Sequence, residues 1–327
     1  MATKRFFIYF LMMLIAAYPV SAAEVSLNRW VLNVTLHDDG KVEEVIQAEI
    51  ENSGSLPLDG FSFVVPASGV TIIYDFDHTS SFTGQVVEQQ SVPGGTKIIV
   101  NFNSSVEAGK KWDGRIGFTA ENWAASVGSN YSIEIPVEAP QAIVAGKNID
   151  ISVPGEAEIR SQVFLPAAVE VTSVTPKPFK ILFQFDHMVP TWSPETLHAG
   201  DVIQIKSSFS SVLNKIVKTD EKWRALKAQI NTAKAQGINV SEAETHLNNA
   251  EDYNTNQALQ SFWKNEDKVA LEYVGYANDE LNQTENSLST PKGTESPQET
   301  AGGKKTPGFG VAGLILVLLI YLVVKKK

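Results

Sequence analysis

The residues best suited to chemistry in this sequence form a repeated tripeptide, Phe-Asp-His, at positions 76–78 and 185–187. A histidine beside a carboxylate can bind a metal ion or act as an acid–base pair. Both copies lie in strand-like stretches, however, where adjacent side chains point to opposite faces. We therefore expect Asp77, His78, Asp186 and His187 to be solvated polar residues at strand ends, and we predict no catalytic residue, metal or cofactor.

Familiar catalytic motifs are absent from the sequence. It contains no His-Glu-x-x-His and no Gly-x-Ser-x-Gly, and Gly94-Gly95-Thr96-Lys97 lacks the spacing of a phosphate-binding loop and indicates a hairpin turn. The absence of cysteine excludes thiol catalysis, thiolate metal sites and disulfides. Catalytic groups scattered along the chain would escape such a search.

Five Asn-x-Ser/Thr triplets with a non-proline middle residue are candidate glycosylation sites. They are Asn33, Asn103, Asn130, Asn239 and Asn282. The first three fall on the polar side of expected strands, and Asn239 falls in a turn between expected helices. Polar residues occupy polar faces in any case, so we predict glycans on only some of these sites.

The charge of the chain excludes one class of partner. Of the 327 residues, 37 are acidic and 27 are Lys or Arg, and five of the basic residues lie in the two apolar ends. The part between the ends therefore has a formal net charge of −15. Nucleic-acid binding needs a basic surface, so we predict no nucleic-acid partner.

Two stretches of the sequence alternate with the period of β-strands. In 24–139, Trp30, Leu32, Val34 and Leu36 share one face, and the next strand places Ile46, Ala48 and Ile50 inward after a turn at 38–40. A weaker pattern runs through 140–209. We predict a multidomain, mainly β then α protein, with tandem antiparallel β-sandwiches at 24–139 and 140–209.

The period changes from 2 to 3.6 near residue 209, which predicts an α-helical hairpin or small bundle at 210–284. Gly237 marks the expected end of its first helix. Apolar side chains nearly vanish at 285–305, a composition typical of a disordered tether.

Both ends of the chain are typical of targeting segments. Residues 1–23 have the basic, apolar and small-residue regions of a secretory signal peptide. Residues 306–327 hold an apolar run, Phe309 to Val324, before three lysines. This run has 16 residues, whereas a membrane span takes about 20. The lysines indicate the cytoplasmic side, so the acidic body is expected outside the cell.

The tether, Pro307-Gly308-Phe309, the apolar segment and the basic terminus together resemble the PGF-CTERM sorting signal of archaeal surface proteins. The resemblance covers about 22 residues. It implies removal of the tail by an archaeosortase and attachment of the new C-terminus to a membrane lipid, after a signal peptidase has cleaved the N-terminus. An uncut short anchor helix and a GPI-type signal at 301–303 stay as alternatives.

The body has fainter likenesses. The stretch IENSGSLPLDGFSFVVP and a late Ala-Gly turn resemble NEW3/CARDB-type β-sandwich modules of archaeal envelope proteins, and the paired β regions resemble the luminal part of ribophorin I more weakly. Neither likeness assigns a functional residue.

These observations favour a non-enzymatic archaeal cell-surface protein, lipid- or membrane-anchored at the extracellular face by its C-terminus. Its expected role is binding or scaffolding at the envelope, with envelope or surface-layer proteins as partners. One alternative is an accessory subunit of a membrane complex for glycan transfer or export. A lower alternative is a surface hydrolase, which would need a cleft with convergent carboxylates or histidines.

Overall fold

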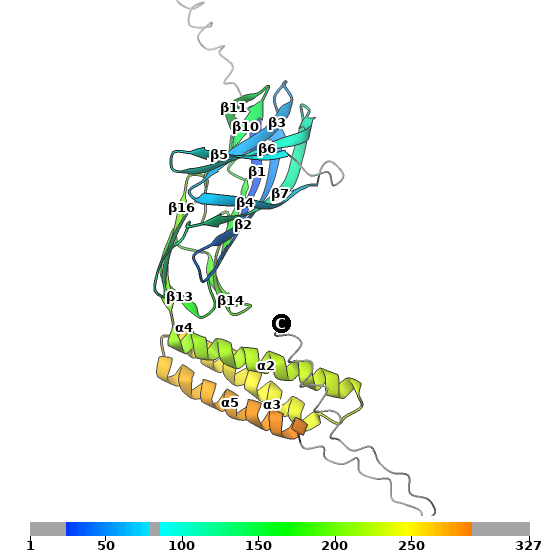
Figure 1. Cartoon of the computed structure of the whole chain (residues 1–327), viewed down its shortest axis with the longest axis vertical. Coiled ribbons are helices and arrows are strands. Elements are labelled where there is room, and N and C mark those ends of the chain that lie inside the picture. The colour runs from blue at the N-terminus through cyan, green and yellow to red at the C-terminus, as the bar shows by residue number, and fades with distance from the viewer. Residues whose placement is uncertain (1–23, 79–85, 290–327) are drawn as a thin grey trace, which may run out of the picture. The chain divides into compact units, whose positions relative to one another are not determined.

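The computed structural model describes residues 24–78 and 86–289 (Figure 1). The expected signal peptide and the sorting signal, with Pro307, Gly308 and Phe309, lie outside the described residues. Within the described ranges, no helix has the length and apolar character needed to cross a membrane. The described part is mainly β, with helices after the sheets, which confirms the predicted order of structure classes.

The strands of the described part form three sheets. The seven-stranded sheet contains, in spatial order, β14 (Lys180–Gln184), β15 (His187–Trp192), β12 (Glu158–Phe164), β1 (Val25–Leu36), β2 (Val42–Asn52), β7 (Lys110–Glu121) and β4 (Ser68–Asp77). The five-stranded sheet contains β11 (Lys147–Asp150), β10 (Gln141–Val144), β3 (Leu58–Val65), β6 (Gly95–Val106) and β5 (Val86–Val92). The four-stranded sheet contains β13 (Val169–Thr175), β16 (Val202–Phe209), β9 (Asn130–Pro136) and β8 (Ala125–Val127).

An aromatic core joins the seven-stranded and five-stranded sheets. Trp30 on β1 meets Phe63 on β3 edge-to-face, with ring centroids 5.7 Å apart. Trp112 on β7 stacks on Phe102 of β6 at 4.8 Å and contacts Phe61 at 5.1 Å. Rings from both sheets therefore fill the space between them, which is sandwich-like packing.

The long hairpin of β1 and β2 follows the predicted alternation. The two strands are antiparallel from Val25↔Asn52 to Leu36↔Val42, joined by the turn at 38–40. Gly40 has a φ of +81°, and a Cβ there would lie 3.2 Å from the Ala124 carbonyl oxygen, so the turn requires glycine. Buried and partly buried residues alternate strictly along β2.

The predicted division into two tandem sandwiches near residue 140 differs from the structure. Strands from both sides of that position share every sheet: β12 pairs in parallel with β1, β10 pairs with β3, and β16 pairs with β9. Alternation in a sequence reports which face of a strand is buried, but it carries no information on which strands pair. The two β regions are therefore interleaved.

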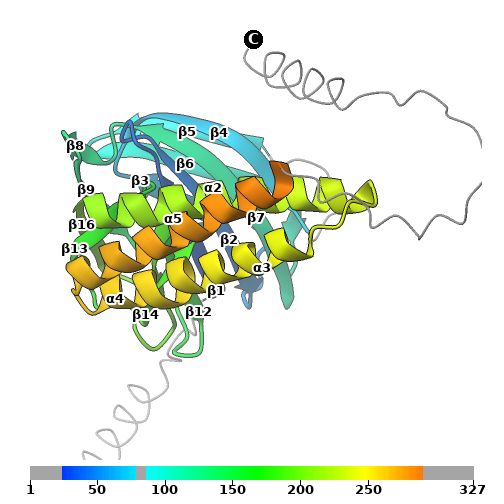
Figure 2. The same cartoon turned by 90° about the horizontal axis from the view of Figure 1, so that it is seen from below.

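The helical part comprises α2 (Ser211–Ala235), α3 (Ser241–Glu251), the π-helix η1 (Asp252–Ala258), α4 (Leu259–Trp263) and α5 (Asp267–Ser289). Figure 2 shows α2, α5 and the run from α3 to α4 side by side. Leu226, Ile230, Leu247 and Leu281 form part of a shared buried cluster. Gly237, with a φ of +77°, follows the end of α2 as predicted. Helix α5 continues into the start of the predicted tether at 285–289.

Candidate functional site

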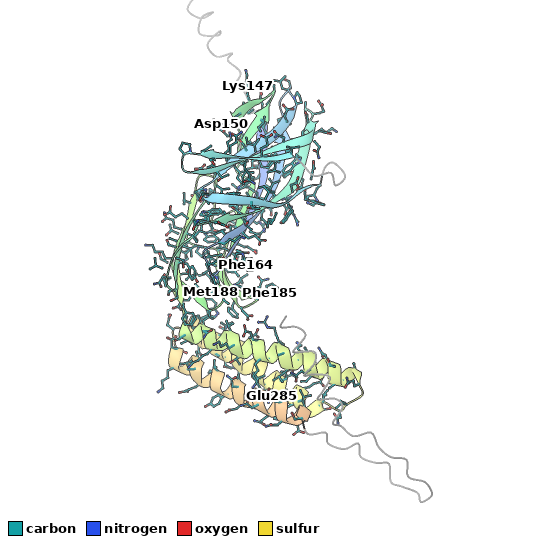
Figure 3. All side chains as sticks on the ribbon, viewed as in Figure 1. Lys147, Asp150, Phe164, Phe185, Met188 and Glu285 are labelled. Atoms are coloured by element: carbon teal, nitrogen blue, oxygen red, sulfur yellow. The ribbon has the colours of Figure 1, made fainter. Side chains whose placement is uncertain are left out.

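The two Phe-Asp-His tripeptides differ in structure. Asp77 is buried at the end of β4, whereas His78 is exposed and its ring meets Phe76 edge-to-face at 4.6 Å. Phe185 and Asp186 form a turn between β14 and β15 with positive φ angles (Figure 3), and His187 Nδ1 bonds to the Leu165 carbonyl oxygen. The described residues contain no group of three acidic or histidine side chains placed to hold a metal ion.

The sequon asparagines have unequal surroundings. Asn103, Asn130, Asn239 and Asn282 are exposed. Asn33 is half-buried in the middle of β1, with β12 and β2 paired on either side. Glycosylation of some of these sites stays a prediction.

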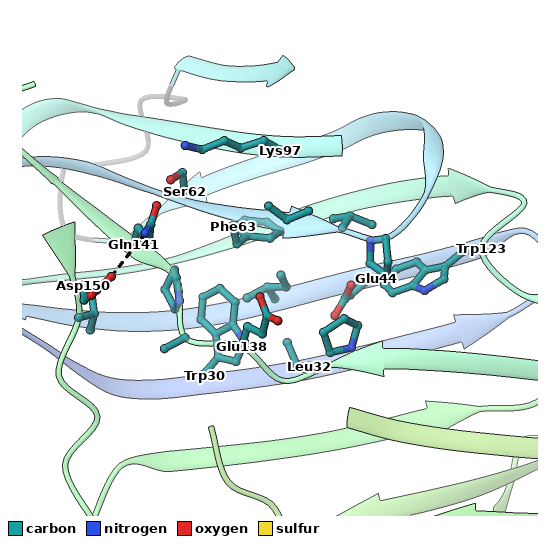
Figure 4. A pocket seen from close by; sticks show the side chains of 18 residues that line it. Trp30, Leu32, Glu44, Ser62, Phe63, Lys97, Trp123, Glu138, Gln141 and Asp150 are labelled. Atoms are coloured by element: carbon teal, nitrogen blue, oxygen red, sulfur yellow. Dashed lines mark hydrogen bonds between the residues drawn. The ribbon is translucent and has the colours of Figure 1, made fainter. Parts of the chain in front are cut away.

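A cleft of about 470 Å³ opens between the seven-stranded and five-stranded sheets (Figure 4). Trp30 and Leu32 of β1 and Glu44 of β2 contribute to one wall, and Phe63 of β3 contributes to the opposite wall. A third wall is the segment 136–141, which connects β9 with β10. Its volume is typical of a site for a small molecule or a short segment of a polymer. We call this space the carboxyl cleft.

The carboxyl cleft exists because two paired strands separate. The ladder between β10 and β3 ends at the pair Gln141↔Ser62. Beyond that pair, β3 continues to Val65 alongside β6, whereas the chain before Gln141 belongs to β9 in the four-stranded sheet. The strands that would close the five-stranded sheet therefore diverge, and a path opens from the surface toward Trp30 and Glu44.

Glu44 is the most unusual residue of this cleft. It occupies an inward position of β2, with 4% of its surface exposed. Its partners across the ladders are Val34 on β1 and Phe118 on β7, both fully buried. Within the described residues, no hydrogen-bond donor or cation contacts its carboxyl. Burial in this apolar setting raises the pKa of Glu44 to about 8, so the carboxyl is protonated at neutral pH.

Other polar side chains line the same cleft. Glu138 lies in the connecting segment and is exposed, and Figure 4 shows its carboxyl group and that of Glu44 in the same space. Ser62 is 2% exposed, and its Oγ has no partner among the described residues. Toward β11, Gln141 Nε2 donates to Asp150 Oδ1 at 3.4 Å. The cleft thus combines a buried neutral carboxyl and an exposed carboxyl with aromatic walls.

The sequence search missed Glu44 and Glu138 because it looked for motifs. A usable signal for Glu44 was present: the expected inward residues Ile46, Ala48 and Ile50 place Glu44 on the same face by period 2. A carboxylate at an apolar strand position costs stability, and such residues cluster at functional sites. Nothing in the sequence indicated Glu138, because its position depends on where the chain leaves β9.

Comparisons with known proteins give remote likenesses only. No family model matches the sequence, and no curated protein matches it significantly. Among solved structures, the M1 zinc metallopeptidase from Deinococcus radiodurans is similar over 57% of this chain and 42% of that chain, at 10% identity and a TM-score of 0.36. Native leukotriene A4 hydrolase from Saccharomyces cerevisiae is similar over 58% of this chain and 31% of that chain, at 10% identity and a TM-score of 0.33.

These comparisons contradict the prediction of a non-enzymatic binding or scaffolding protein, because the solved structures named above are a metallopeptidase and a hydrolase. This chain spans less than half the length of either. At such identities and TM-scores the likeness assigns this chain neither a reaction nor a catalytic residue. We withdraw the non-enzymatic interpretation. The hydrolase alternative is argued below from the residues of the carboxyl cleft alone.

Proposed function

We propose that this chain is a hydrolase that works by general acid–base catalysis in the carboxyl cleft, with Glu44 as the general acid and Glu138 as the general base. The supporting observation is the contrast between two carboxyl groups lining one cleft: Glu44 is buried in an apolar wall, whereas Glu138 faces solvent. Two carboxyl groups in contrasting environments can divide the acid and base roles between them.

The proposed reaction gives each carboxyl one role. The Glu138 carboxylate accepts a proton from a water molecule as its oxygen attacks the scissile bond. The Glu44 carboxyl donates its proton to the leaving group as that bond breaks. Water is thereby divided between the two products, and exchange with solvent returns the proton to Glu44 and removes it from Glu138.

A further polar group of the cleft has a role in positioning. Lys97 is register partner of Val64 on β3 and lines the same cleft, where it can hold an anionic group of a substrate.

We further propose that the enzyme acts outside the cell. The signal-peptide pattern of residues 1–23 and the likeness of 306–327 to a PGF-CTERM signal support export, processing by an archaeosortase and attachment to a membrane lipid. The acidic body and the absence of cysteine are compatible with an extracellular surface. Its substrates would then be constituents or neighbours of the envelope.

The test compares wild type with three variants, each of which replaces one glutamate by glutamine. Wild type, Glu44→Gln, Glu138→Gln and the control Glu43→Gln are assayed against 4-nitrophenyl glycosides, 4-nitrophenyl esters and fluorogenic peptides. Glu43 is the matched control because it neighbours Glu44 on β2 but lies on the opposite face. We expect one substrate class to be hydrolysed, a loss of about 100-fold or more in Glu44→Gln and Glu138→Gln, and full activity in Glu43→Gln.

Two outcomes contradict the proposal. One is the absence of hydrolysis by wild type in all three substrate classes. The other is a Glu44→Gln variant that is as active as Glu43→Gln. Circular dichroism of each variant establishes that a lost activity is not a lost fold.

A further inference from the structure

The opposite face of the seven-stranded sheet carries a second hollow, which we call the outer groove. Its volume is about 560 Å³, and it crosses β14, β15, β12, β1 and β2. On β1, Arg29, Val31 and Asn33 line the outer groove, whereas Trp30 and Leu32 line the carboxyl cleft. The alternation of side chains in β1 therefore separates the two spaces.

Strand register aligns polar side chains into a row along the floor of the outer groove. Lys180 is opposite Thr191, Thr191 is opposite Gln162, and Gln162 is opposite Asn33. Neighbouring strands lie about 4.8 Å apart, so the row presents a polar group at each such step. In the next row, Arg160 is opposite Val31, which is opposite Gln47. The groove thus has an ordered polar floor rather than a random polar surface.

The amides of this floor have unused hydrogen-bonding capacity. Asn33, Gln47 and Gln162 are half-buried, and no hydrogen bond of their side chains occurs among the described residues. Each amide can donate and accept at once. Vicinal hydroxyl groups need that combination, because each hydroxyl also donates and accepts.

An aromatic ring and positive charges border the polar floor. Phe179 is 62% exposed, and Lys180 Nζ lies 5.8 Å from its ring centroid. Arg29 and Arg160 both pair with Glu158, at 3.1 and 3.0 Å, and Arg29 also pairs with Glu49 and Asp113 at 3.6 Å. Lys180 is a third cation of the lining, and it has no ion pair among the described residues. An unpaired ammonium group therefore borders the floor in a chain whose formal net charge is −10.

We propose that the outer groove binds an acidic oligosaccharide. The row of amides bonds the sugar hydroxyls, the exposed Phe179 ring covers an apolar sugar face, and Lys180 pairs with a carboxylate of the sugar acids. A neutral saccharide would leave Lys180 without a counter-ion, and a simple anion would leave the amides and the ring unused. This site is independent of the hydrolase proposal, because its residues lie on the other face of the sheet.

A glycan on Asn33 is the competing occupant. The Asn33 side chain belongs to the floor of the outer groove, so a covalent glycan there would fill the space that we assign to a separate ligand. Peptide mapping of the native protein by mass spectrometry decides between the two. We expect unmodified Asn33, and a glycan on Asn33 would overturn the proposal.

Binding is tested with defined saccharides on the full chain. Isothermal titration calorimetry compares tetragalacturonate with the neutral maltotetraose and with sodium sulfate. We expect measurable binding of tetragalacturonate alone. Gln162→Ala and Phe179→Ala should each raise its Kd about fivefold or more, which is the effect of one or two lost hydrogen bonds or of a lost stacking surface.

Two controls locate the ligand. Gln184→Ala removes an exposed amide from β14 beyond the lining of the groove, and Glu44→Gln alters only the carboxyl cleft. Both should leave the Kd within about twofold of wild type. No binding of tetragalacturonate, an unchanged Kd in both Gln162→Ala and Phe179→Ala, or loss of binding in Glu44→Gln would each overturn the assignment.

Discussion

Glu44 faces Phe118 across the ladder between β2 and β7, so a carboxyl group shares the inner surface of the sheet with a fully buried aromatic ring. An ionised carboxylate in this position would be removed from water without a compensating charge. The carboxyl therefore retains its proton, and the pKa of Glu44 rises to about 8 from its usual 4.5. This relationship affects both the stability of the fold and the pH dependence of the proposed activity.

The first prediction concerns stability and pH. Between about pH 4.5 and 8 the unfolded chain has lost the Glu44 proton and the folded chain retains it, so the free energy of unfolding falls as pH rises. The Glu44→Gln variant has no carboxyl group at this position, so its free energy of unfolding does not fall with pH for this reason. Urea denaturation should show equal stability of wild type and Glu44→Gln at pH 4, and a variant more stable by roughly 3–5 kcal/mol at pH 8.5, at about 1.4 kcal/mol per pKa unit.

Glu43→Gln is the control for that measurement, since Glu43 lies on the opposite face of β2. Its stability relative to wild type should change little between the two pH values. A difference between wild type and Glu44→Gln that is the same at pH 4 and pH 8.5 would show that Glu44 does not hold a proton in the folded protein.

The second prediction concerns activity and pH. A general acid must be protonated, so kcat/KM should fall as the pH rises through about 8, the pKa of Glu44. Replacing Lys97 by alanine should lower the rate while leaving this alkaline limb in place, because Lys97 is assigned to positioning. Activity that stays constant up to pH 10 would remove Glu44 from the role of acid.

The third prediction concerns the strand that forms one wall of the carboxyl cleft. A Cβ on Gly60 of β3 would lie 2.1 Å from the Val100 carbonyl oxygen of β6, a contact with backbone that no side-chain movement relieves. Gly60→Ala should therefore lower the free energy of unfolding by about 3 kcal/mol. Gly155→Ala is the matched control, since a Cβ there would meet nothing within 4 Å. Equal stability of the two variants in thermal melts would show that β3 and β6 lie further apart.

The fourth prediction concerns the C-terminus. If the tail from Thr306 is a sorting signal, the mature protein from native membranes should end upstream of Phe309 and carry a lipid adduct. Intact-mass spectrometry measures this directly, and replacement of Pro307-Gly308-Phe309 by three alanines provides the unprocessed control. A native protein that ends at Lys327 would leave the uncut anchor as the explanation.

Several elements were predictable from local pattern alone. The alternation from Trp30 to Leu36 and from Ile46 to Ile50 indicated the first hairpin, and Gly237 marked the end of α2. These features depend on residues close in sequence, because strand period, turn chemistry and helix ends are local properties. The alternation along β2 also implied the burial of Glu44, because Glu44 shares a face with Ile46 and Ile50.

Strand partners were not predictable in this way. The parallel pair of β1 and β12 joins residues about 130 positions apart, and no short-range pattern specifies that choice. The predicted tandem sandwiches failed for this reason. Both candidate sites depend on the same long-range pairing: the carboxyl cleft needs β10 to leave β3 at Ser62, and the outer groove needs Gln162 to lie beside Asn33.

The sequence by itself therefore determined the order of structure classes and the net acidic charge, because composition and periodicity carry that information, and it predicts targeting segments at the two ends. Only the tertiary structure decided that Glu44 and Glu138 share a cleft and that Lys180, Thr191, Gln162 and Asn33 form a row. The physical reason is that the pKa of a carboxyl and the spacing of ligand-binding groups are set by neighbours in space.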